Sequence, residues 1–230
     1  NRFGESRYTD VAVRLSFLLW NTDIDLMTYQ GSLTPKEYGL DLSRNLQDNL
    51  EVHAELSVAQ KTHRFVIANG ILQSEQSDVV SYLLGIRYLN EWNTTVIAEY
   101  YRNEFWLSKE EYQAYRDFLL NGLAVGTPAA IQQTLAISQT YFKSSTLMQD
   151  YLYVKISQPE PFGWLYFTPS LYSIYNLNDK SFLISASLNY KPVTNVEFIF
   201  WPSLLVGGES SEFGSRQARQ RFELWMRVFF

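Results

Sequence analysis

The chain has 230 residues, of which 46% are hydrophobic and 16% aromatic, and its formal net charge at pH 7 is −5. This hydrophobic content is that of a folded protein, and the absence of a basic block argues against nucleic acid as a partner. The sequence contains no cysteine. Disulfides, cysteine-ligated metals and thiol catalysis are therefore excluded.

The first ten residues, NRFGESRYTD, are polar and charged, so they do not form a signal peptide. No apolar run reaches the roughly 18 residues that a transmembrane helix needs. Two interpretations fit these facts. One is a cytosolic protein. The other is an exported chain, or the C-terminal part of a longer one, whose membrane segments are strands.

Alternating apolar and polar residues then recur along the chain. In the segment 11–19, Val11, Val13 and Leu15 share one face, while Arg14 and Ser16 share the other. This period of two is typical of a strand with one apolar face. Clear copies lie at 49–60, 79–89, 181–190 and 221–230, and weaker ones at 24–30, 36–44, 62–70, 94–102, 150–157, 164–174 and 195–205. We expect about twelve strands of about ten residues, the length that a tilted strand needs to cross a bilayer.

The predicted connections alternate between short turns and longer loops. The short ones are LTPK, QK, NEWN, QPEPFG and KPVTN; the others include QSEQSD, NLNDKS, GGESSEFGSRQ and an insertion near 104–147. Within the third of these, residues 209–215 have the composition of a polar loop. Short turns at one end of a sheet and longer loops at the other are typical of outer-membrane barrels.

The insertion at 104–147 has the signals of a helical hairpin. Ser108 and Glu111 form a capping-box pattern, and Asn121-Gly122 is a plausible stop. A second helix is expected to open at Thr127-Pro128, with proline at its first position. The expected apolar faces are Tyr112, Tyr115 and Leu119 on the first helix, and Ile131 and Leu135 on the second.

The last segment, RFELWMRVFF, alternates most clearly. Phe222, Leu224, Met226, Val228 and Phe230 share one face. With the other amphipathic segments, this ending resembles the closing strand of a Gram-negative outer-membrane β-barrel. The resemblance is one of pattern over residues 1–230 and identifies no specific family.

This resemblance implies a single all-β domain: a transmembrane antiparallel up-and-down barrel in the bacterial outer membrane, with the helical insertion in an extracellular loop. Its partners would be outer-membrane lipids and the barrel-insertion machinery, which reads the terminal strand as an assembly signal. A soluble all-β protein with outward charged faces is the alternative. Strand length, loop asymmetry and the terminal Phe230 favour the barrel.

The polar faces supply the candidate lumen residues. These are Arg14, Asp41, Glu51, His53, Glu55, Arg64, Arg87, Arg219, Arg221 and Arg227. Closure of the barrel would bring Arg14 beside the arginines of the last strand, as a basic wall facing acidic strands. Opposed walls would line a porin-like pore, whereas interlocked ion pairs would fill a narrow barrel.

Three functions follow from these residues. The first is a channel for small polar solutes, and the second is a non-conducting barrel that holds a protein partner at residues 104–147. The third is a hydrolase based on His53, which lies in a row with Glu51 and Glu55. No metal or cofactor is expected, because no His-X-X-X-His or acidic calcium loop occurs in the sequence.

Overall fold

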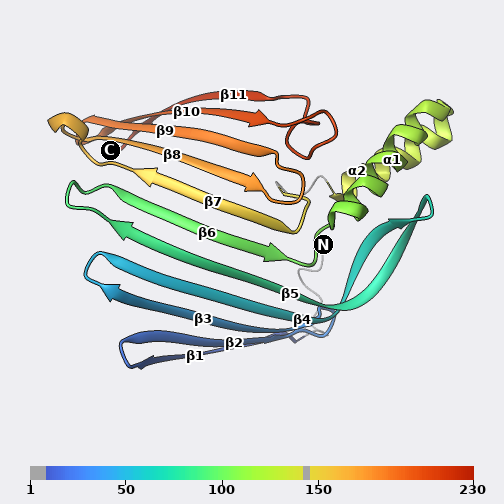
Figure 1. Cartoon of the computed structure of the whole chain (residues 1–230), viewed down its shortest axis with the longest axis horizontal. Coiled ribbons are helices and arrows are strands. Elements are labelled where there is room, and N and C mark those ends of the chain that lie inside the picture. Colours follow the sequence, from blue (N-terminus) through green and yellow to red (C-terminus); the bar gives the residue numbers. More distant parts are fainter. Residues whose placement is uncertain (1–8, 142–145) are drawn as a thin grey trace. The chain divides into compact units, whose positions relative to one another are not determined.

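A computed structural model describes residues 9–141 and 146–230, and it forms one antiparallel up-and-down sheet whose strands are joined in sequence order (Figure 1). The predicted all-β class is confirmed, with two helices added. The strands are β1 Val11–Leu19, β2 Thr22–Gln30, β3 Lys36–Gln47, β4 Leu50–Ala68, β5 Ile71–Leu89, β6 Thr95–Asn103, β7 Asp150–Ser157, β8 Phe167–Asn176, β9 Phe182–Val193, β10 Val196–Val206 and β11 Gln220–Val228. The helices are α1 Lys109–Val125 and α2 Pro128–Tyr141, and a short 3-10 turn spans Pro161–Gly163.

The chain divides into two compact units. The first contains residues up to Arg44, His53–Leu83 and Arg102–Gln149, and the second contains Asn45–Val52, Leu84–Tyr101 and Asp150–Phe230. Strands β1 and β2 and both helices belong to the first unit. Strands β7 to β11 belong to the second. Residues 142–145 of the predicted insertion lie outside the described residues.

The prediction of about twelve strands was wrong, because the described residues form eleven. Two predicted strands, at 49–60 and 62–70, are one strand, β4. The expected turn at Gln60-Lys61 is a local irregularity: Lys61 has φ 51° and its amide donates to Oδ1 of Asp78 at 2.9 Å. The chain reverses instead at Asn69-Gly70, where φ is 53° and 74°. Positive φ at both central residues is what a two-residue hairpin turn requires.

The connections differ between the two ends of the sheet as predicted, but some of them lie at the other end from the one expected. Residues 20–21, 48–49, 90–94, 158–166 and 194–195 form the short-turn end of the sheet, and residues 31–35, 69–70, 104–149, 177–181 and 207–219 form the long-loop end. The segment LTPK therefore lies at the long-loop end, not among the short turns as predicted. The 104–149 segment lies at the end opposite the last residue of β11, as predicted.

The predicted helical hairpin is confirmed, and its first helix is longer than predicted. The capping box of Ser108 and Glu111 is present, and α2 begins with Pro128. Helix α1 does not stop at Asn121-Gly122. It continues to Val125 and ends at Gly126, whose φ is 69°. Of the described helices, neither is long and apolar enough to cross a membrane.

Gly122 lies inside α1 and does not end it, and α2 packs closely against this position. A Cβ built on Gly122 would lie 2.1 Å from the hydroxyl of Thr134, which is buried on α2. The predicted apolar face of α2 is wrong in part, since Leu135 is exposed while Thr134 and Ile137 are buried. The missing side chain at Gly122 is thus what lets the two helices approach.

Substitution Gly122→Ala should lower the free energy of unfolding of the helical hairpin by about 1–3 kcal/mol, because the added methyl group overpacks the contact with Thr134. In a Thr134→Ala background the same change should cost much less, since the clashing hydroxyl is gone. Urea unfolding followed by the helical circular dichroism signal measures both. An equal cost in the two backgrounds would contradict this packing.

Candidate functional site: the polar face of the sheet

The register of the second unit separates two faces of its strands. Between β10 and β11, Phe198 is opposite Met226 and Phe200 is opposite Leu224, while Glu197 is opposite Arg227. The same parity continues into β9, where Leu188 is opposite Phe200. We call these the apolar face and the polar face. The apolar face keeps its character from strand to strand, whereas the polar face also carries Ile199, Trp201 and Trp225.

In this unit large apolar side chains are exposed while several polar ones are buried. On the apolar face of β11, Leu224 is 75% exposed and Phe222 is 67% exposed. On the polar face, Ser185 is 1% exposed and Glu197 is 5% exposed. Burying polar groups while leaving large apolar ones outside is unfavourable in water. The apolar face therefore needs an apolar environment.

Buried polar groups on this face are hydrogen-bonded to one another. The hydroxyl of Ser185 contacts that of Ser203 at 2.7 Å and accepts from Nε1 of Trp201 at 2.7 Å. Glu197 accepts from Nδ2 of Asn189 at 2.6 Å. Its carboxylate also lies 3.3 Å from Arg227 and 3.8 Å from Lys191. Such satisfaction is what a buried carboxylate requires.

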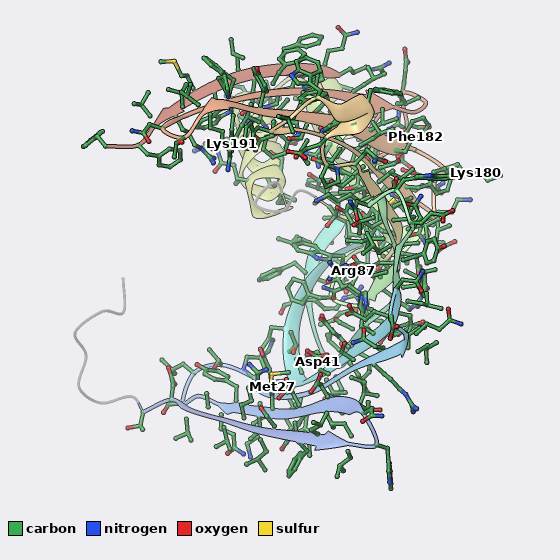
Figure 2. All side chains as sticks on the ribbon, turned by 90° about the vertical axis from the view of Figure 1, so that its left-hand side faces the viewer. Met27, Asp41, Arg87, Lys180, Phe182 and Lys191 are labelled. Carbon is green, nitrogen blue, oxygen red and sulfur yellow. The ribbon has the colours of Figure 1, made fainter. Side chains whose placement is uncertain are left out.

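The polar face of the first unit carries a second ion pair. Arg14 on β1 and Ser16 both donate to the carboxylate of Asp25 on β2. The register places Asp41 on β3 directly opposite Asp25. Figure 2 shows side chains standing on both faces of the strands, with Met27 and Asp41 on the same face.

Three arginines of the predicted basic wall are paired with nearby carboxylates. Arg14 pairs with Asp25, Arg227 with Glu197, and Arg221 with Glu223 at 2.5 Å. Elsewhere in the second unit Arg87 lies 3.7 Å from Glu51. Each of these arginines is thus paired with a carboxylate on its own strand or on a neighbouring one.

The other predicted lumen residues are placed separately. Arg219 is exposed just before β11, and its carbonyl accepts from the amide of Leu205 at 2.8 Å. His53 and Glu55 lie on β4. In the part of the chain that the structure describes, no group of three or more His, Asp or Glu residues is arranged to hold a metal ion. The catalytic role of His53 stays a hypothesis.

The predicted assembly residues occupy the apolar face of the last strand. Phe222, Leu224, Met226 and Val228 alternate along β11 and are exposed, and Phe230 follows the end of the strand. Their role in assembly stays a prediction. Their placement shows that the alternating residues of this segment point to opposite faces of the strand.

Arg64 belongs to a different structure. The distal part of the β4–β5 hairpin, residues 60–79, packs against α1 and α2, and we call this assembly the head. Arg64 forms an ion pair with Glu111 of α1 and donates to the carbonyl of Glu104 at 2.6 Å. The buried apolar residues of the head are Val66, Ile67, Val79, Leu107, Tyr112, Tyr115 and Ile137. The sequence pattern predicted the helices but gave no sign of this packing.

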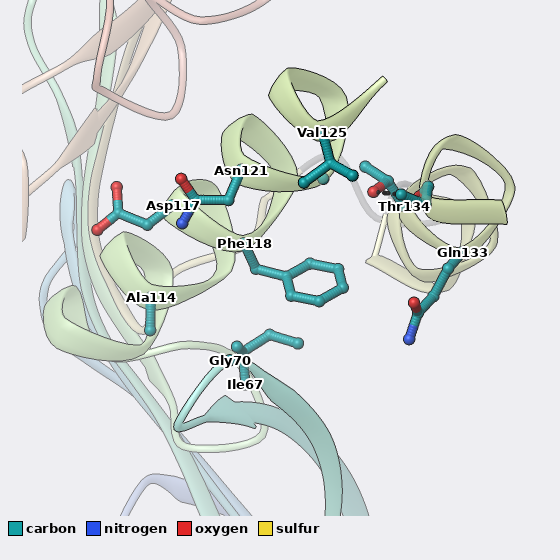
Figure 3. Close-up of a pocket in the computed structure, with 11 residues that line it drawn as sticks. Ile67, Gly70, Ala114, Asp117, Phe118, Asn121, Val125, Gln133 and Thr134 are labelled. Atoms are coloured by element: carbon teal, nitrogen blue, oxygen red, sulfur yellow. Dashed lines mark hydrogen bonds between the residues drawn. The ribbon is translucent and has the colours of Figure 1, made fainter. Parts of the chain in front are cut away.

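The head contains a cavity of about 410 Å³ between α1, α2 and the hairpin tip (Figure 3). Phe118 from α1 lies between the tip, at Ile67 and Gly70, and Gln133 on α2. Polar groups at Asp117 and Asn121 also line it. Large apolar side chains are exposed on the same two helices: Leu120, Leu123, Val125 and Leu135.

Comparisons with protein-family models, curated proteins and solved structures found no match. The site is therefore interpreted from its own geometry.

Substitution Glu111→Gln should destabilise the head by about 1–3 kcal/mol, because it removes the charged partner of a mostly buried arginine. Glutamine still serves the capping box, so the loss reports the ion pair. Glu110→Gln is the matched control, since Glu110 is exposed in the same helical turn and loses the same charge. Thermal unfolding followed by helical circular dichroism compares them, and equal shifts for both variants would refute a structural role for the Arg64–Glu111 pair.

Proposed function

We propose that this chain is an integral outer-membrane β-barrel that passes small polar solutes along its polar face. The observation that carries the proposal is the reversed polarity of the second unit. On the apolar face β10 and β11 expose Phe, Leu, Met and Val side chains, and the opposite face holds buried, hydrogen-bonded polar groups. A sheet of this kind is stable when lipid meets the apolar side and water or polar groups meet the other.

Aromatic residues at the short-turn end support the same environment. In the second unit, Trp92 and Trp164 lie in two neighbouring turns and are exposed. The turns are joined by Gln158, whose Nε2 donates to the carbonyl of Trp92 at 2.8 Å. Trp164 also packs on Phe167, with ring centroids 4.4 Å apart. Tryptophan and tyrosine favour the boundary between lipid and water.

A membrane location requires both edges of the sheet to be hydrogen-bonded, because lipid cannot satisfy free backbone groups. The strand order begins with β1 and ends with β11. Since eleven is odd, β1 and β11 run in the same direction, and direct closure between them would be parallel. Closed barrels with an odd strand number are known.

Solutes are proposed to pass because the polar face combines carboxylates, arginines and hydroxyls. Selectivity in such pores comes from the width of the lumen and from the polar groups that line it. Pairs such as Arg14–Asp25 and Arg227–Glu197 keep fixed dipoles on the wall while limiting net charge. Small, polar and uncharged or zwitterionic solutes fit this lining best.

The head favours a second candidate function, a non-conducting barrel that holds a protein partner. The supporting observation is the 410 Å³ cavity together with exposed Leu120, Leu123 and Leu135 on the same helices. Purified protein reconstituted into planar bilayers separates the two functions. Stepwise conductance supports the channel, and its absence in correctly inserted protein supports the docking barrel.

Two adjacent residues of β8 test the membrane environment. Leu171 is on the apolar face opposite Ile156 and Ala186, and Ser170 is on the polar face opposite Ser157 and Ser187. Leu171→Lys should destabilise the protein in lipid vesicles by about 2–4 kcal/mol, because it places a cation in hydrocarbon. Ser170→Lys should cost much less.

Urea unfolding in vesicles measures both variants. Leu171 is 45% exposed, so in a water-soluble protein its replacement by lysine would be nearly neutral. A neutral Leu171→Lys variant would therefore argue against lipid on this face.

Replacement of residues 108–146 by a short Gly/Ser linker should leave a protein that still inserts. The flanking residues are already held together, since the amide of Leu107 donates to the carbonyl of Leu147 at 2.9 Å. Heat-modifiable migration on gels and unaltered channel conductance would be the expected results. Loss of insertion would indicate that the helical segment is part of the membrane structure.

A further inference from the structure

The loop between β10 and β11, residues 207–219, has a buried middle section, residues 211–214, where a connection of this kind is normally exposed. Ser211, Glu212 and Phe213 are all buried, and Glu212 is only 1% exposed. A carboxylate in this position has lost its water and must be held by protein donors. Its partners show what the loop is attached to.

Glu212 is bound to strands that are distant from its own in the sheet. Its Oε2 accepts from the hydroxyl of Tyr151 on β7 at 2.6 Å and from Nδ2 of Asn176 on β8 at 2.8 Å. Its backbone amide donates to Oδ2 of Asp179 at 2.6 Å, and Arg216 lies 4.0 Å from Oε1. The loop is therefore fixed through both the side chain and the backbone of one residue.

The register gives the direction of this attachment. Tyr151 and Asn176 are directly opposite each other in the β7–β8 pair, and they stand on the polar face. The loop leaves β10, so β8 and β7 are two and three strands away, roughly 10–15 Å at the usual strand spacing. The loop thus reaches across the polar face at the long-loop end of β9.

Close packing keeps the loop in this path. A Cβ on Gly214 would lie 2.1 Å from the carbonyl of Gly208, and one on Gly207 would lie 2.7 Å from the Cβ of Ser181. The amide of Phe213 donates to the hydroxyl of Ser181 at 3.3 Å. The loop is therefore closely packed, and the carboxylate of Glu212 is its side-chain attachment to β7 and β8.

We propose that loop 207–219 is the constriction that limits the size of the solute, and that Glu212 is the positioning residue that holds it across the polar face. This inference rests on the proposed channel function and names the element that sets its selectivity. The Glu212 carboxylate is already hydrogen-bonded to Tyr151 and Asn176. The loop therefore narrows the passage by its volume. Removal of its attachment should widen the passage.

The experiment compares Glu212→Ala with Glu209→Ala, because Glu209 is exposed in the same loop and carries the same charge. Single-channel conductance in planar bilayers and the entry of uncharged sugars of increasing size into vesicles are measured. Glu212→Ala should raise conductance about twofold and admit larger sugars, since passage depends on pore width. Glu209→Ala should leave the size limit unchanged. Tyr151→Phe removes only one donor and should give a smaller change in the same direction.

A labelling readout reports the position of the loop without relying on conduction. The sequence has no cysteine, so Phe213→Cys introduces a unique and buried thiol. It should resist a water-soluble maleimide in the parent chain and react in the Glu212→Ala background. A released loop with unchanged conductance and size limit would overturn the constriction while leaving the channel intact. If neither the parent nor the released variant conducts, the channel function itself fails, and the constriction fails with it.

Discussion

The alternation of side chains along each strand, held in register between neighbours, is the constraint on which the rest of this structure depends. Because side chains alternate with a period of two, a slip of one residue between β10 and β11 would move Arg227 onto the face of Phe198 and Phe200. The polar network on the other face would lose its partners at the same time. Both faces therefore specify the same register between β10 and β11, which are joined by a long loop and not by a tight turn.

The same constraint explains why charged groups can be buried here. Glu197 sits between Asn189, Lys191 and Arg227, and Glu212 sits between Tyr151, Asn176 and Arg216. A buried carboxylate is tolerated when several donors replace its water. The polar face supplies these donors from adjacent strands, so the core of the second unit is built of hydrogen bonds and ion pairs as much as of apolar contacts.

Much of the sheet could be predicted from the sequence, because alternation needs only local information. The strand count failed at Lys61, where the positive φ is stabilised by Asp78 from the opposite strand. The helix end failed at Gly122 because its glycine serves packing against Thr134 and not termination. The structural roles of Arg64 and Glu212 were missed because their partners are distant in the sequence. The 209–215 segment has the composition of a polar loop, and only the structure reveals that residues 211–214 are buried, with Glu212 in contact with Tyr151 and Asn176.

The two long strands, β4 and β5, are longer than a membrane crossing requires. Strands β4 and β5 have 19 residues each, about 60 Å at 3.3 Å per residue, whereas β6 has nine. About ten residues suffice to cross a bilayer, so in the proposed membrane setting the distal half of this hairpin must stand beyond it. Its backbone is paired within the hairpin and its side chains pack on α1, where Arg64 meets Glu111. In that setting the head would be carried by the paired strands of the sheet itself and not by a separate linker.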